Sequence, residues 1–374
     1  MPDRQASTHA QQTGKQNRPT NAFFRHLPIR TAMTQTPTLS YRSQPFVRLL
    51  FLALVMLSCL GLLAPLAAQA DDGQDWPNRN IHLIVPFPGG SSPDLLARTL
   101  AEHLSNKLDR SVVVENKPGA GGNIGTSFVS RAKPDGYTLL VTINGPIVTA
   151  PTLYQQTLNY DPYTELQPIS LIGTSPNVLV VGKDFPADNL SEFIAYAQAH
   201  PNELNYGTVG AGSASHLSMA MLEHEADIEL QHIPYSSFPQ IISALIAGDI
   251  QASFMVPGIA MPQVEAGEVR ALAITSLEES PLLPNMPTVQ DSGFDDFEAI
   301  SWNALYVPAG TPDLIVDQLN ALTKEILANE EVVERLQALY FTPLPSSPAE
   351  MNARVQDEKA RWDAVINRLG LSLD

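Results

Sequence analysis

Residues 81–115 read IHLIVPFPGGSSPDLLARTLAEHLSNKLDRSVVVE, and this stretch decides the fold class. Residues 81–86 form a short apolar run typical of a buried strand, and residues 93–108 place leucines at helical spacing. Residues 111–115 are again rich in β-branched side chains, which favour strands. A strand, a helix and a second buried strand predict a βαβ unit with parallel strands.

The same alternation continues along the chain. A helix is predicted at residues 123–133 and a strand at residues 137–143. A second series then has predicted strands at 178–181, 204–206, 231–234, 252–256 and 271–275, and helices at 190–199, 215–225 and 239–247. The pattern predicts an α/β protein with a mostly parallel sheet.

The last part of the chain is predicted to be helical. Thr311 and Pro312 provide a cap and a first helical position for a helix over residues 313–328. Ser347-Pro348-Ala349-Glu350 is a capping box, and Gly370 fits the left-handed position that ends a helix.

The amino terminus has the pattern of a secretory signal peptide. The apolar run LLFLALVMLSCLGLL at residues 49–63 follows Arg42 and Arg48 and precedes Ala-Gln-Ala at residues 68–70. Such a run is too short to be typical of a membrane span, and the small residues predict cleavage after Ala70. Met33 opens a segment of ordinary signal length, so a start at either Met1 or Met33 stays open.

Charge and cysteine content exclude several classes of protein. Residues 1–70 hold seven of the 22 basic residues, one of the 39 acidic ones and the single cysteine, Cys59. The remaining 304 residues therefore carry 15 basic and 38 acidic side chains, a net charge of −23. This balance argues against nucleic-acid binding, and the lack of cysteine excludes a disulfide scaffold. The sequence predicts an exported acidic protein held together by its apolar core.

Two loops that join a strand to a helix have the composition of anion-binding sites. Residues 87–94 read FPGGSSPD, where Ser92 is a predicted helix cap and Pro93 the first helical residue. Residues 207–216 read GTVGAGSASH. Glycines expose backbone N–H groups at a helix N-terminus, where the helix dipole favours an anion. Asp94 either braces its loop or meets an ammonium or hydroxyl group of a ligand.

Other motifs fail in detail. Residues 117–126, KPGAGGNIGT, resemble a phosphate-binding loop but have Thr126 where such a loop needs lysine. Histidines at positions 200, 216, 224 and 232 have no ligand spacing, and no G-x-S-x-G elbow occurs. No metal site, cofactor or catalytic residue is therefore predicted.

Several runs together resemble one family. VVENKPGAGGNIG at residues 113–125 and KPDGYTLL at residues 133–140 are the most specific. They are accompanied by IVPF at 84–87, YDP at 160–162, GAGS at 210–213, PY at 234–235, LAITS at 272–276 and PAGTP at 308–312. From about Trp76 to its end, the chain is similar to the Bug-type extracytoplasmic solute receptors, the binding components of tripartite tricarboxylate transporters.

The resemblance implies a two-lobed periplasmic binding protein fold of type II, with two crossover strands and a ligand cleft between the lobes. Residues 1–70 would be removed, residues 71–177 and 300–374 would form the first lobe, and residues 178–299 the second. It also implies a periplasmic, monomeric protein without enzymatic activity, which binds a small carboxylate and meets membrane permease subunits but no nucleic acid.

Positions that match the family's binding loops are candidate ligand contacts. In the first lobe they are Phe87, Pro88, Gly89, Gly90, Ser91, Ser92, Asp94 and Asn144. In the second lobe they are Gly212, Ser213, His216, Tyr235, Ser236 and Phe254.

One departure from the family bears on the ligand. Many members have Pro-Tyr-Lys-Gly where this chain has Pro-Tyr-Ser-Ser at residues 234–237. The lost lysine removes a cation, so a mono- or dicarboxylate, including an aromatic one, is favoured over a tricarboxylate. Two alternatives remain: a receptor that reports its ligand to a membrane signalling partner, and an exported hydrolase that uses Ser213 and His216.

Overall fold

The structure is a computed structural model that describes residues 76–374. The predicted signal peptide, the two possible start residues, Cys59 and the cleavage position at Ala70 lie outside the described residues. Within residues 76–374, no helix combines the length and the apolar character that crossing a membrane requires.

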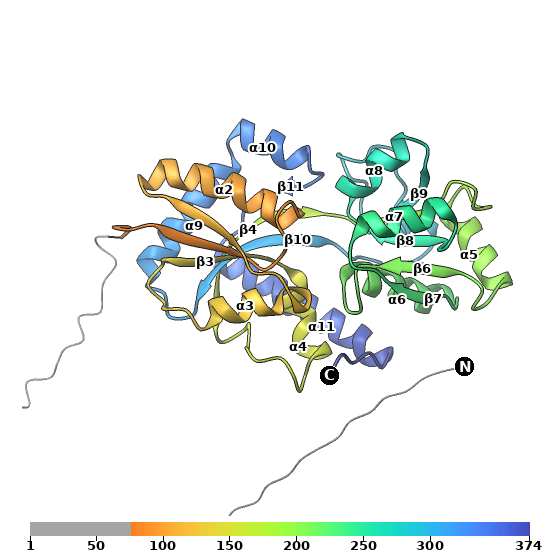
Figure 1. The fold of residues 1–374 in the computed structure, drawn as a ribbon, viewed down its shortest axis with the longest axis horizontal. Coiled ribbons are helices and arrows are strands. Elements are labelled where there is room, and N and C mark those ends of the chain that lie inside the picture. Colours follow the sequence, from red (N-terminus) through yellow and green to blue (C-terminus); the bar gives the residue numbers. More distant parts are fainter. Residues whose placement is uncertain (1–75) are drawn as a thin grey trace, which may run out of the picture. The chain divides into compact units, whose positions relative to one another are not determined.

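A six-stranded sheet forms the first lobe (Figure 1). Its order is β11-β4-β10-β3-β1-β2, with bounds β1 Ile81–Val85, β2 Val112–Asn116, β3 Thr138–Ile143, β4 Leu166–Ser175, β10 Ser301–Pro308 and β11 Thr342–Pro343. β1 pairs in parallel with β2 and β3, as the βαβ pattern predicts. β10 runs antiparallel to both β3 and β4.

A five-stranded sheet forms the second lobe. Its order is β7-β6-β8-β5-β9, with bounds β5 Val178–Gly182, β6 Asn205–Thr208, β7 Gln231–Pro234, β8 Ala252–Met255 and β9 Val269–Ile274. β6 is parallel to β7 and β8, whereas β5 is antiparallel to β8 and β9. The prediction of a mostly parallel sheet is therefore wrong. Both sheets are mixed, because β5 and β10 enter their sheets directly from the other lobe and not through a helical crossover.

Helices cover the sheets. Their bounds are α2 Ser92–Leu108, α3 Asn123–Ser130, α4 Ala150–Leu153, α5 Leu190–Ala199, α6 Ala214–Ala226, α7 Phe238–Ala247, α8 Pro257–Glu265, α9 Asp313–Leu327, α10 Glu330–Gln337 and α11 Pro348–Arg368. One buried apolar cluster joins α2, α9 and α10 to the six-stranded sheet, and another joins α7 and α8 to the five-stranded sheet. A third cluster continues from α11 through Trp302 to Phe254 in the second lobe.

The predicted helix caps agree with the structure at the last helix but not at α2 and α9. Ser91, not Ser92, is the N-cap of α2, so Pro93 is its second residue. Pro312 precedes α9, while the Thr311 hydroxyl donates to the Pro308 carbonyl instead of capping the helix. The capping box of Ser347 and Glu350 and the left-handed Gly370 (φ +63°) are confirmed.

The chain passes between the lobes twice, once between β4 and β5 and once just before β10. Buried polar groups join the two passages: Asn177 Nδ2 and Thr275 Oγ1 both donate to the carbonyl oxygen of Ala299, each at 2.8 Å. Asn144 Nδ2, at the end of β3, donates to the carbonyl oxygen of Ile300 at 3.2 Å. The passages are therefore tied to each other and to the first lobe.

Candidate functional site

The two predicted loops occupy equivalent places in the two lobes. Of the predicted stretch 87–94, residues 87–91 form the first loop, which joins parallel strand β1 to α2, and the remainder belongs to α2. Of the predicted stretch 207–216, residues 209–213 form the second loop, which joins parallel strand β6 to α6, and its ends belong to these two elements. In open α/β sheets, ligands bind outside the carboxyl ends of such strands. Each loop therefore lies where its own sheet would present a ligand.

Both loops are closed by the same serine turn. The backbone N–H and the hydroxyl of Ser91 donate to the carbonyl oxygen of Pro88 at 3.2 and 2.7 Å. The backbone N–H and the hydroxyl of Ser213 donate to the carbonyl oxygen of Gly210 at 3.3 and 2.7 Å. Each serine is also the N-cap of the helix that follows. The same serine turn therefore occurs once in each lobe.

A glycine just before each serine is held by a side chain from the helix's first turn. Gly90 has φ +81° and donates its N–H to Asp94 Oδ2 at 2.8 Å, and Gly212 has φ +74° and donates to His216 Nδ1 at 3.0 Å. In both cases the acceptor lies four residues after the glycine. Positive φ is the reason that glycine is required at these positions.

Asp94 braces the first loop. Its side chain is 2% exposed, and Asn116 and Arg98 also donate to its oxygens, at 2.8 and 3.0 Å. Burial raises the pKa of Asp94, but the hydrogen bonds from Arg98, Gly90 and Asn116 outweigh it and lower the pKa overall. The sequence left open whether Asp94 braces its loop or meets a group of the ligand, and these hydrogen bonds show that it braces the loop.

His216 is a neutral brace of the second loop. Its ring stacks on that of His232, with centroids 4.2 Å apart and planes at 21°. Burial, with a smaller contribution from His232, lowers the pKa of His216 to about 4. His232 Nε2 lies 2.6 Å from Thr208 Oγ1, which in turn accepts the N–H of Gly210 at 3.1 Å. The two imidazoles therefore support both ends of the second loop.

The turns leave backbone donors available. No hydrogen bond within residues 76–374 uses the N–H of Ser92 or Asp94 in α2, or of Ala214 or Ser215 in α6. These are first-turn groups, which have no partner inside their own helix. Both helix starts can therefore donate to an anion.

Tyr235 and Ser236 lie beside the second loop. Pro234 of β7 pairs with Thr208 of β6, and the N–H of Tyr235 donates to the Thr208 carbonyl at 2.8 Å. Tyr235 is half-buried and Ser236 is exposed. The structure therefore brings this predicted pair next to the second loop.

Phe87 rests on the glycine-rich stretch that only looked like a phosphate loop. A Cβ on Gly122 would lie 2.8 Å from both Phe87 Cζ and Pro146 Cγ, and Gly122 has φ +100°. This glycine therefore has a packing role beneath the first loop, which fits the absence of a nucleotide-binding pattern.

Two other predicted residues have structural partners. The side chain of Asn144 is held by Ile300 of the second passage, and it is buried. The ring of Phe254 is completely buried in the core of the second lobe. The structure gives both side chains a supporting role next to the loops.

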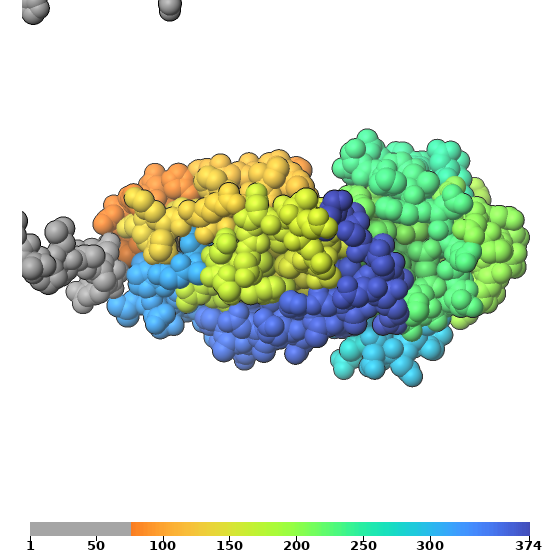
Figure 2. All heavy atoms as spheres, turned by 90° about the horizontal axis from the view of Figure 1, so that it is seen from below, coloured from red at the N-terminus to blue at the C-terminus, as the bar shows by residue number. Residues whose placement is uncertain are grey.

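The second loop contacts the first lobe, which the sequence did not predict. A Cβ on Gly212 would lie 2.8 Å from Cδ1 of Leu153 in α4 and from Cδ1 of Leu373 after α11. Arg368 of α11 also approaches Glu225 of α6 at 3.5 Å. Figure 2 shows the dark-blue carboxy-terminal end of the chain between the yellow-green surface of the first lobe and the green second lobe.

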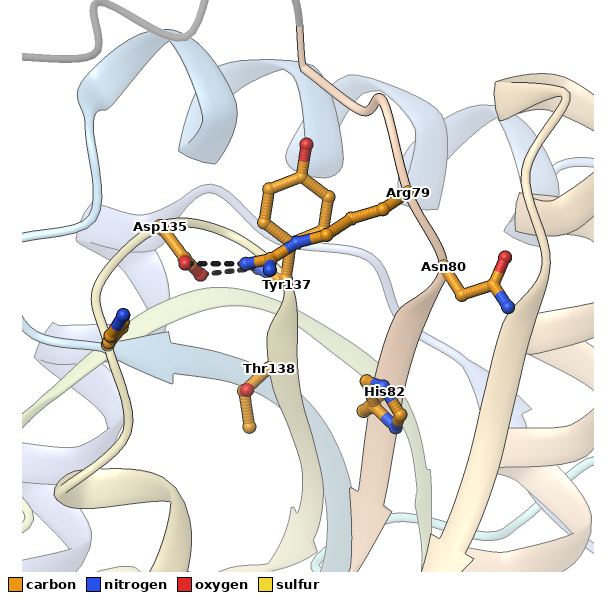
Figure 3. Close-up of a pocket in the computed structure, with 7 residues that line it drawn as sticks. Arg79, Asn80, His82, Asp135, Tyr137 and Thr138 are labelled. Atoms are coloured by element: carbon orange, nitrogen blue, oxygen red, sulfur yellow. Dashed lines mark hydrogen bonds and ion pairs between the residues drawn. The ribbon is translucent and has the colours of Figure 1, made fainter.

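A separate cavity of about 270 Å³ lies at the opposite end of the strands. It is lined by Arg79, Asn80, His82, Lys133, Asp135, Tyr137 and Thr138 (Figure 3). Arg79 is paired with Asp135 at 2.8 Å and lies 4.1 Å above the Tyr137 ring. Because it opens at the start of β1, whereas the first loop follows the end of β1, this cavity is not part of the candidate site.

Hydrolase and metal chemistry receive no support from the geometry. The Ser213 hydroxyl donates to Gly210, and the His216 ring accepts from Gly212, so neither side chain uses the other as nucleophile or base. Within residues 76–374, no group of three or more His, Cys, Asp or Glu side chains is arranged to hold a metal ion.

Comparison with known proteins gives the context of this site. A family model described as "Tripartite tricarboxylate transporter family receptor" matches residues 96–371. The solved structure of R. palustris Rpa4515 with adipate has a TM-score of 0.74 and 34% identity, over 80% of this chain and 99% of that chain. The periplasmic binding protein BugD has a TM-score of 0.71 and 34% identity, over 79% and 99% of the two chains.

MatC (Rpa3494) from Rhodopseudomonas palustris with bound malate has a TM-score of 0.70 and 32% identity, over 78% of this chain and 100% of MatC. These relatives share the two-lobed periplasmic binding protein fold, and the family consists of receptors, not enzymes. The chain therefore belongs to the tripartite tricarboxylate transporter family of receptors.

Proposed function

We propose that this protein captures a small dicarboxylate or monocarboxylate between the first and second loops and presents it to a membrane permease of the tripartite type. It works in the periplasm as a monomer, without chemistry on the ligand. The observation that carries the proposal is the repeated turn: Ser91 with Gly90 in one lobe and Ser213 with Gly212 in the other.

Backbone donors are the principal ligand contacts in this proposal. A carboxylate between the lobes would accept from the first-turn N–H groups of α2 and α6, which have no partner within the described part of the chain. In this proposal the ligand is lined by residues 88–90 and Ser236, which are exposed, and by Phe87 and Tyr235, which are half-buried. Four buried side chains support these residues from behind and are not assigned a direct ligand contact: Asp94, Asn144, His216 and Phe254.

Ligand size and charge follow from the same residues. Relatives at 34% and 32% identity hold adipate and malate, both dicarboxylates. Ser236 stands where many family members have lysine, so no side-chain cation is supplied there for a third carboxylate. We therefore assign a dicarboxylate as the first candidate and an aromatic monocarboxylate as the second.

Lobe closure provides the signal that the permease reads. A ligand that contacts both loops stabilises the closed arrangement more than the open one, and it shifts the population by that difference in affinity. Within residues 76–374, the chain connects the two sheets only twice, between β4 and β5 and just before β10. These two segments are hydrogen-bonded to each other at Asn177, so we expect bending to be concentrated there.

Native mass spectrometry and a thermal-shift panel test the proposal. Protein purified without refolding should release a carboxylic acid, and adipate, malate or benzoate should raise the melting temperature. A ligand at about 100 times its Kd stabilises by about 2.7 kcal/mol. Ester substrates should give no turnover. A panel in which no carboxylate shifts the melting temperature, or in which an ester is hydrolysed, would overturn the proposal.

A further inference from the structure

We propose that His216 is a positioning residue that makes the second loop the carboxylate-binding half of the site, while Asp94 leaves the first loop as the weaker half. This inference rests on the proposed function. Gly90 and Gly212 donate equivalent hydrogen bonds in the two lobes, but the acceptor is the carboxylate of Asp94 in the first loop and the imidazole of His216 in the second.

Geometry fixes the state of the imidazole. His216 Nδ1 accepts the Gly212 N–H at 3.0 Å, so this nitrogen carries no proton and the ring is neutral. His216 is 8% exposed, and its ring stacks on that of His232 with the centroids 4.2 Å apart. Protonation of Nδ1 would set two donors against each other and break the contact.

The acceptor orients the backbone around Gly212. With its N–H held by His216, the chain turns at φ +74° into the Ser213 cap, and the N–H groups of Ala214 and Ser215 follow in the first turn of α6. A neutral acceptor achieves this without placing a negative charge behind those donors.

The first loop differs in this respect. Asp94 places a carboxylate behind Gly90, and its partner cation, Arg98, is half exposed to solvent. Asp94 accepts directly from the loop's Gly90, whereas Arg98 contacts Asp94 and Asn116, so the nearer charge is negative and opposes an incoming carboxylate there. We assign the ligand's principal carboxylate to the second loop and its distal polar group to the first.

Three variants at one position separate shape from charge. His216→Asn places a neutral acceptor where Nδ1 lies, His216→Asp places a charged acceptor there, and His216→Leu removes the acceptor. The probes are adipate and malate, whose Kd is measured by calorimetry at two salt concentrations. His224→Asp is the matched control, because His224 is exposed near the end of the same helix.

The Asn variant should keep the Kd of the wild-type protein within about threefold, whereas the Leu and Asp variants should weaken it by about tenfold or more. The loss in the Asp variant should shrink at high salt. His224→Asp should bind as the wild-type protein does. Melting temperatures show whether each variant is folded.

An NMR readout distinguishes a failure of this inference from a failure of the proposed function. The His216 ring should show the Nε2–H tautomer, and the Gly212 amide should stay hydrogen-bonded in the Asn variant but not in the Leu variant. If wild-type protein binds no carboxylate, the proposed function fails. If it binds and the Leu variant binds equally, His216 does not position the loop; if the Asp and Asn variants bind equally, the assignment of the two halves is wrong.

Discussion

Asn177 in the first passage between the lobes donates its side-chain N–H to the carbonyl oxygen of Ala299 in the second passage, at 2.8 Å. Asn177 is 2% exposed, and its Oδ1 accepts from the hydroxyl of Ser301 at 3.3 Å. One buried amide therefore joins both chain passages. In the proposed function, lobe closure would bend the chain near this residue.

Removal of the amide should destabilise the whole protein. Asn177→Ala removes a buried donor and leaves Ala299 with Thr275 as its remaining partner, so the free energy of unfolding should fall by about 1–3 kcal/mol in urea titrations. Ser301→Ala, which removes only the longer bond, should cost less. Equal unfolding curves for Asn177→Ala and the wild-type protein would contradict a structural role for this amide.

Gly212 should tolerate no side chain. Gly212→Ala combines φ +74° with a Cβ 2.8 Å from methyl groups of Leu153 and Leu373, so the variant should lose about 1–3 kcal/mol and bind carboxylate more weakly. Adding Leu373→Ala removes one of the two clashes.

The double variant should therefore be more stable than the sum of the two single changes predicts, which is a positive coupling in a double-mutant cycle. Strict additivity would show that the Gly212–Leu373 contact does not form in solution.

The serine caps should differ in effect. Ser213 Oγ accepts from the N–H of His216 and donates to Gly210, whereas Ser91 makes no side-chain cap bond. Ser213→Ala should therefore cost about 1 kcal/mol of stability and also weaken carboxylate binding, because the second loop loses the shorter of its two closing hydrogen bonds. Ser91→Ala should cost less stability. An unchanged Kd in Ser213→Ala would remove the second loop from the site.

Glu223 should make stability depend on pH. Burial raises the pKa of Glu223 to about 7, although Leu230 N–H and Tyr206 donate to it. The folded protein therefore holds this proton more tightly than the unfolded chain does, and the contribution of Glu223 to stability falls as pH rises from about 4.5 to about 7.

Glu223→Gln lacks this titration. At pH 8 it should be more stable than the wild-type protein by roughly 1–3 kcal/mol, and the two proteins should converge below pH 5. His216, with its pKa lowered to about 4, acts in the opposite direction, so the comparison must be made between wild-type and variant at each pH. A difference that stays constant with pH would contradict the buried-acid interpretation.

Local patterns predicted both loops and most of the helices, but α4, α8 and α10 were not predicted. The helix at 190–199 and the strand at 231–234 have the predicted bounds, because apolar spacing and caps are properties of consecutive residues. The serine turns are also local, since each closes within three residues. This is why both loops could be found before their surroundings were known.

Contacts between distant residues were not predicted. The residue patterns did not mark β4, which contains Pro168, or β10, because their pairing depends on partners more than 100 residues away. The contact of Gly212 with Leu153 and Leu373, and the stacking of His216 on His232, likewise depend on tertiary structure. The family resemblance made His216 a candidate ligand contact, but the sequence did not show that its ring accepts from the backbone of Gly212.

Calorimetric titration of the wild-type protein with adipate, malate and citrate tests the central claim most directly. Ligand capture between the two loops predicts saturable binding of one dicarboxylate per chain, and citrate should have a higher Kd than the tighter-binding one of adipate and malate. It also predicts that Gly212→Ala in the second lobe weakens this binding. Absence of binding by every carboxylate, or citrate as the tightest ligand, would contradict it.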